Sequence, residues 1–167
     1  MDDRLIITIG YNETDETALR AGDLGTLFTA LARDYKDVTK GRVLVVVSIR
    51  RGSIIATLTD WALQSLPYVR GRVETAEGVK ALADFWKLLK ELIDQAGAGK
   101  WKKRRGRKMP VQQSVEAIIE IAAESGRPVR LEHRRANGAT LKVVMSAQQA
   151  VRLRGSAGAR RRTTNRR

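Results

Sequence analysis

The stretch "VRLEHRRANGATLKVVM", residues 129–145, decides the fold. Two runs with the character of β-strands, 129–135 and 140–145, flank the segment Ala136-Asn137-Gly138-Ala139. An Asn-Gly pair between two such runs is the strongest short-range signal of a β-hairpin, and a two-residue turn of this kind needs φ > 0 at both positions. The sequence therefore predicts an antiparallel hairpin that turns at Asn137 and Gly138.

Helices are predicted on both sides of this hairpin. Residues 111–124 carry apolar side chains at helical spacing, and Ser125-Gly126 provides the stop. After the hairpin, Ser146 is a suitable N-cap for a short helix that runs to about Arg154. The remaining residues, 155–167, are small and cationic and cannot form a core, so we expect a disordered basic tail.

The first half of the chain repeats the same kinds of element. Residues 4–11 alternate as a strand does, and the runs 42–49 and 54–59 form a second hairpin signal around a cationic turn. Asp23 is a possible N-cap for a helix with an apolar stripe that ends at Tyr35. A longer amphipathic helix is predicted over residues 75–95.

These elements give the order β-α-β-β-α, a basic linker, then α-β-β-α. Antiparallel hairpins packed with amphipathic helices define an α+β fold. The predicted organisation is a first half of the body (1–99), a basic linker (100–110), a second half of helix and hairpin (111–154), and the basic tail (155–167). Two arrangements stay open at this point: one sheet of about five strands shared by both halves, or two small subdomains joined by the linker.

The positive charge of the chain is concentrated in two segments. The 167 residues include 32 basic and 18 acidic side chains, for a formal charge of +14. Fourteen of the basic residues lie in two stretches that contain no acid, which leaves a formally neutral body. They are Lys100, Lys102, Lys103, Arg104, Arg105, Arg107 and Lys108 in the linker, and Arg152, Arg154, Arg160, Arg161, Arg162, Arg166 and Arg167 near the C-terminus. A neutral body with cationic arms is typical of proteins that bind an acidic polymer or surface.

Nucleic acid is the partner that this pattern favours. Each Lys or Arg on a phosphate releases a condensed counterion and gives affinity with little sequence preference. Trp101 lies between Lys100 and Lys102, where it could stack on an unpaired base or instead anchor the linker to the protein's own surface; the sequence supports both equally. No recognition helix for duplex DNA is evident, so we expect RNA or single-stranded DNA. The predicted binding residues are Lys100, Trp101, Lys102, Lys103, Arg104, Arg105, Arg107, Lys108, Arg160, Arg161, Arg162, Arg166 and Arg167.

A second hypothesis uses the same arms differently. The neutral body could be a protein-interaction or assembly module whose basic arms bind an acidic protein surface or a neighbouring subunit. Membranes also attract polybasic segments, but no apolar insertion or acylation signal lies beside the arms, so stable membrane attachment is not expected. The oligomeric state is left open by the sequence.

The sequence carries no catalytic or cofactor signature. There are no cysteines, which excludes thiolate metal sites and disulfides, and the chain has no Walker, GxGxxG or HExxH motif. His133 is the single histidine and has no designated partner, so a structural or surface role is favoured over a catalytic one. Gly22-Asp23-Leu24-Gly25 matches a GxxG pattern, but the acidic Asp23 would repel phosphate. We therefore predict a non-enzymatic cytoplasmic protein that needs no metal or cofactor.

Overall fold

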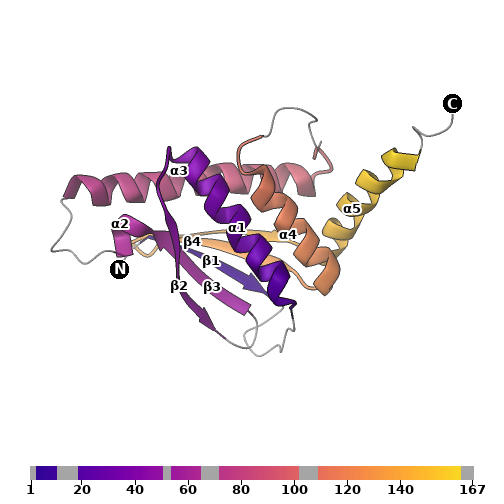
Figure 1. The fold of residues 1–167 in the computed structure, drawn as a ribbon, viewed down its shortest axis with the longest axis horizontal. Helices are drawn as coiled ribbons and strands as arrows, with labels where there is room; N and C mark the ends of the chain where they lie inside the picture. Colours follow the sequence, from indigo (N-terminus) through magenta and orange to yellow (C-terminus); the bar gives the residue numbers. More distant parts are fainter. Residues whose placement is uncertain (1–2, 11–18, 51–53, 65–71, 102–108, 163–167) are drawn as a thin grey trace.

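The chain forms an α+β fold around one five-stranded sheet (Figure 1). The computed structural model describes residues 3–10, 19–50, 54–64, 72–101 and 109–162. The strands pair in the order β2-β3-β1-β4-β5, and every neighbouring pair is antiparallel. Because β1 pairs with β3 on one side and with β4 on the other, both halves of the chain share the sheet. The bounds are β1 (Arg4–Ile9), β2 (Leu44–Arg50), β3 (Ile54–Asp60), β4 (Val129–Arg134) and β5 (Thr140–Met145).

The helices cover one side of this sheet. Figure 1 shows α1, α3 and α4 on the same side of the strands, while α5 packs against α4. The predicted fold class and element order are confirmed, with one short additional helix, α2, after β3. The bounds are α1 (Ala21–Val38), α2 (Trp61–Gln64), α3 (Arg72–Gly97), α4 (Gln112–Ser125) and α5 (Ala147–Arg162).

Strand alternation builds the core. Leu5, Ile7 and Ile9 of β1 point toward the helices and are almost completely buried, in one cluster with Leu27 of α1 and Phe85 of α3. Side chains on alternate positions of a strand face opposite sides of the sheet, so β1 presents its other residues on the face away from the helices.

The most apolar strand lies at the edge of the sheet. Among the described strands, β2 pairs with β3 alone, and its ladder shifts register between Val46 and Ser48. Val46 and Ile49 remain 42% and 56% exposed. An irregularity of this kind in an edge strand twists it away from further pairing, which is one way in which proteins protect an apolar edge.

The hairpin of β4 and β5 is confirmed, but its turn differs from the prediction. Arg135 and Ala139 form the closing pair around a three-residue loop, and the N–H of Gly138 donates to the carbonyl of Arg135. Only Gly138 has positive φ (85°), while the Asn137 side chain accepts a hydrogen bond from the N–H of Ala139. Three loop residues, and not the predicted two, separate the closing pair. A three-residue loop needs a left-handed conformation only at its last position, which is Gly138.

Two helix boundaries also differ from the prediction. α1 begins at Ala21 after the N-cap Arg20, which makes no side-chain capping bond, and Asp23 lies in the first turn, where its charge favours the positive end of the helix dipole. The Gly22–Gly25 segment is thus the start of a helix. The predicted end of the last helix near Arg154 is wrong, because α5 continues to Arg162. Disorder of the tail in the free protein stays a prediction. Alanine and arginine favour a helix that is already nucleated by packed residues.

Candidate nucleic-acid interface

The basic linker leaves α3 through a defined helix stop. Gly99 adopts a left-handed conformation (φ 73°), its N–H donates to the carbonyl of Ala96 at 3.0 Å, and the N–H of Lys100 donates to the carbonyl of Gln95 at 2.9 Å. This pair of bonds is the Schellman arrangement, in which glycine supplies the left-handed residue that turns the chain off the helix axis. The stop fixes the point at which Lys100, which is exposed, begins the basic linker.

Trp101 lies half-buried and packs against the hydrophobic core. An indole in such a contact gains from the burial of its apolar surface, so the contact ties the start of the linker to the body. This position supports the second of the two roles considered for Trp101, the anchoring of the linker. Stacking of a base on the exposed part of the ring remains a prediction.

The far end of the linker is anchored as well. Met109 packs against the core, and its N–H donates to the side-chain oxygen of Gln112 at 3.1 Å. Val111 is buried and has φ 56°, a left-handed conformation that costs a residue with a Cβ about 1–2 kcal/mol. The surrounding packing must hold Val111 in place, so the linker returns to the body at a rigidly specified point.

A carboxylate from α1 caps the helix that follows. The N-cap of α4, Val111, has no side chain that can accept a hydrogen bond. Instead the buried Asp34 accepts bonds from the backbone N–H and the hydroxyl of Ser114, both at 2.7 Å. An anionic acceptor at a helix N-terminus satisfies free N–H groups and favours the dipole. α1 therefore fixes the start of α4 and, with it, the end of the linker.

The structure covers the predicted binding residues unevenly. Lys100 and Trp101 are placed as above, and Arg160, Arg161 and Arg162 lie in the last turn of α5. The other predicted residues lie outside the described part of the chain: Lys102, Lys103, Arg104, Arg105, Arg107, Lys108, Arg166 and Arg167. Arg154, which belongs to the second basic stretch, contacts Glu120 and Glu124 of α4 at 3.4 and 3.3 Å and so holds α5 against that helix.

The second basic segment extends toward the side of the molecule on which the linker joins the body. α5 packs against α4 and runs roughly in the opposite direction, so its C-terminal end points toward the side where the linker enters α4 (Figure 1). Trp101 and Arg162 are far apart in the sequence, so the direction of one segment relative to the other depends on the fold. The fold thus directs the C-terminal end of α5 toward the side on which the linker is attached (Figure 1).

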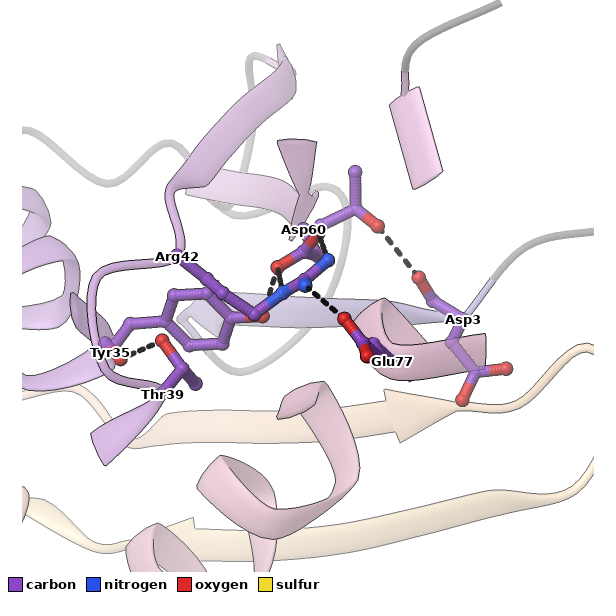
Figure 2. Close-up of polar contacts among 7 residues, drawn as sticks. Asp3, Tyr35, Thr39, Arg42, Asp60 and Glu77 are labelled. Carbon is purple, nitrogen blue, oxygen red and sulfur yellow. Dashed lines mark hydrogen bonds and ion pairs between the residues drawn. The ribbon is translucent and has the colours of Figure 1, made fainter. Parts of the chain in front are cut away.

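A buried ion-pair cluster that sequence reasoning missed lies elsewhere (Figure 2). Asp60, at the end of β3, accepts hydrogen bonds from the Tyr35 hydroxyl at 2.5 Å and from two guanidinium nitrogens of Arg42 at 2.9 and 2.8 Å. Glu77 of α3 also approaches Arg42 at 3.6 Å. Burial first, and then the bond to Asp60, raises the pKa of Tyr35 well above its usual value. The Tyr35 hydroxyl therefore stays a donor.

This cluster stabilises the contact between three elements of the fold. It joins the end of α1, the end of β3 and the start of α3, and both carboxylate oxygens of Asp60 are satisfied. Gly78 of α3 leaves room for it, since a Cβ at that position would lie 3.0 Å from Asp60 Oδ1. No sequence motif marks the cluster, because its residues are scattered over four places in the chain.

His133 is fully buried on the helix-facing side of β4. Its ring lies 5.9 Å from that of Trp86, and Nε2 is 3.4 Å from Asp3 Oδ2, outside good hydrogen-bond geometry. Burial lowers the pKa of His133 despite the opposing effect of Asp3. This position agrees with the structural role that the sequence favoured.

The described residues were also compared with what a metal site and a membrane-spanning helix require. Over these residues no group of three or more His, Cys, Asp or Glu side chains is placed to hold a metal ion. The helices that the structure describes also include none that is long and apolar enough to cross a membrane. Comparisons with protein-family models, with curated protein sequences and with solved structures find no match to this chain.

Proposed function

We propose that this chain is a non-enzymatic nucleic-acid-binding protein that holds RNA or single-stranded DNA through its basic linker and its Arg-rich C-terminal segment. The observation that carries the proposal is that the C-terminal end of α5 points toward the side on which the linker enters α4. Two cationic segments that extend to one side can contact the same polyanion, and the second contact is then intramolecular and strengthened by a high effective concentration.

The anchoring of the linker supports the same proposal. Trp101 and Met109, at the two ends of the linker, pack on the core. The seven residues between them include six cations, and both ends of this segment are attached to the body. Fixing the ends of a loop before binding lowers the conformational entropy that is lost on binding. Contacts to phosphates then supply affinity with little sequence preference.

The test is a salt series with a fluorescent oligothymidylate. Replacing Lys102, Lys103, Arg104 and Arg105 with Gln should reduce the slope of log K against log salt by up to about 3, because each phosphate contact to a single strand contributes about 0.7. The matched control replaces Arg33, Lys36, Lys80 and Lys87 with Gln; these are exposed residues of α1 and α3 and change the net charge equally. The proposal predicts a much larger effect of the linker variant.

Two outcomes would contradict the proposal. Absence of oligonucleotide binding by the unaltered protein at low salt would reject it. Equal slopes for the linker variant and the control would show that the linker does not contact the phosphates. Tight binding of an acidic polypeptide without binding of the oligonucleotide would favour the protein-interaction module instead.

A further inference from the structure

None of the described helices covers the second face of the sheet (Figure 1). The residues of β1 that alternate with the core positions are Arg4, Ile6 and Thr8, and strand alternation places them on this second face. The strand registers extend this face across the sheet, with Thr8 opposite Arg130 and Ile6 opposite Glu132. We call it the open face. An antiparallel sheet commonly leaves one face to the solvent, so its residues need not serve the core.

The open face is strongly basic over β1, β4 and β5. Its ionisable side chains on these strands are four cations and one carboxylate, namely Arg4, Arg130, Arg134, Lys142 and Glu132. Arg4 lies directly opposite Arg134 in the β1–β4 ladder. Like charges directly across a ladder destabilise a sheet, so stability alone does not explain this pair.

The charges on the open face are only partly compensated. Glu132, which is almost buried, contacts Arg134 at 3.4 Å and Lys142 at 3.5 Å, while both cations remain 56% exposed. Within the part of the chain that the structure describes, neither Arg4 nor Arg130 has a carboxylate partner. Among the described residues, no carboxylate therefore competes with an external anion for these two cations.

The helix layer has the opposite charge. α1, α3 and α4 together contain eleven acidic and six basic residues. The formally neutral body is thus polarised, with the excess of acid over the helices and the excess of base on the open face. Within the body, without the linker and α5, such a distribution attracts a polyanion to the basic face more than to the surfaces of α1, α3 and α4.

We propose that the open face is a second phosphate-binding surface, on which Arg4, Arg130, Arg134 and Lys142 contact the backbone of a single-stranded nucleic acid. The inference rests on the proposed function, because it takes the same polymer as its ligand. None of the five strands contains Phe, Tyr or Trp, so this surface offers no ring on which a base can stack. It binds the sugar–phosphate backbone and does not read the sequence.

Glu132 competes with the ligand in this arrangement. In the free protein its carboxylate occupies Arg134 and Lys142, and a phosphate must share or displace these contacts. Removing the negative charge of Glu132 should therefore strengthen binding. Glu132→Gln keeps the size of the side chain and a polar group opposite the two cations, so it is the appropriate substitution.

The experiment measures affinity for oligothymidylate across a salt series in the full-length chain. Arg4→Gln combined with Arg130→Gln should reduce the salt slope by up to about 1.4. The control pair, Arg33→Gln with Lys36→Gln, removes two charges from α1 and should change the slope much less. Glu132→Gln should tighten binding about twofold to fivefold, as expected for one partly screened charge. Glu91→Gln on α3 makes the same change in net charge and should have little effect, since salt screens it from the open face.

The outcomes separate this inference from the proposed function. If the linker variant weakens binding but the open-face pair behaves like its control, the inference is wrong and the proposed function stands. If the unaltered protein does not bind the oligonucleotide, both are wrong. If polyglutamate binds with the same dependence on Arg4 and Arg130 while the oligonucleotide does not bind, the open face recognises acidic protein instead. Circular dichroism checks the fold of each variant, and if Glu132→Gln unfolds the chain, the variant with Arg4→Gln and Arg130→Gln, two half-buried residues, still decides.

Discussion

Asp60→Asn is expected to be among the most destabilising single substitutions in the described part of this chain. The carboxylate is only 1% exposed and accepts three hydrogen bonds, from Tyr35 and from two nitrogens of Arg42. Asparagine removes the negative charge and replaces one acceptor oxygen with an NH₂ group, which would face donors. Of the two ion pairs described above, Arg42 would then lose the short one and keep the longer contact to the exposed Glu77.

The expected cost follows from this geometry. Breaking a buried ion pair by removing one partner costs about 3–5 kcal/mol, because the remaining charge is left uncompensated. Arg42 reaches solvent, with 22% of its side chain exposed, so we expect the lower end, about 3 kcal/mol. A domain of this kind is stable by about 5–15 kcal/mol, so the loss is a large part of the total.

The assay is urea unfolding followed by far-ultraviolet circular dichroism, with Asp94→Asn as the matched control. Asp94 pairs with Lys90 on the exposed surface of α3 at i, i+4 spacing, where such a pair contributes about 0.3–0.5 kcal/mol. Equal losses of unfolding free energy for the two substitutions would refute the buried cluster. Tyr35→Phe should cost about 1.5–3 kcal/mol, the range for a hydrogen bond to a charged group, and should lose most of this effect when Asp60 is already Asn.

Two further predictions concern β4 and its turn. The lowered pKa of His133 means that the unfolded chain takes up a proton at a higher pH than the folded chain, so stability should fall below about pH 6.5 by up to about 1.4 kcal/mol per pH unit. His133→Leu should remove this part of the slope in urea midpoints between pH 7 and 5, and an unchanged slope would assign the acid sensitivity to other groups. Gly138→Val should cost about 1–2 kcal/mol because Gly138 is left-handed, whereas Ala136→Val in the same turn should cost less; equal thermal midpoints for these two variants would contradict the turn geometry.

Local patterns predicted the elements of this fold well. The alternation of Leu5, Ile7 and Ile9 and the Asn-Gly signal both depend on neighbours in sequence, and both gave strands that the structure confirms. The turn at Asn137 was wrong in detail because the same dipeptide fits a two-residue and a three-residue loop, and the closing pair decides between them. The predicted end of α5 was wrong because the glycines and the positive charge of the segment suggested disorder. Its alanine and arginine residues instead continue the helix.

The buried polar contacts could not be predicted in this way. Tyr35 was correctly placed on the buried stripe of α1, but its partner Asp60 is 25 residues away and comes from a strand end. Asp34 likewise caps a helix that begins nearly 80 residues later. Such contacts depend on which elements become neighbours in the sheet and helix layers. That order is set by the whole core and not by any local signal.

Unlike the buried polar contacts, the charge pattern of the open face was partly visible in the sequence. Once residues 129–134 are accepted as a strand, alternation places Val129, Leu131 and His133 on one side and Arg130, Glu132 and Arg134 on the other. Counting charges over the whole body gave neutrality and concealed this separation, because the acids of α1, α3 and α4 cancel the bases of the open face in the sum. A net charge of zero does not mean that the electrostatic potential is zero at both surfaces of the body. The two sets of charges lie on opposite layers, and salt screens one from the other over about 10 Å. A polyanion near this protein therefore meets different surfaces on its two sides, although the body carries no net charge.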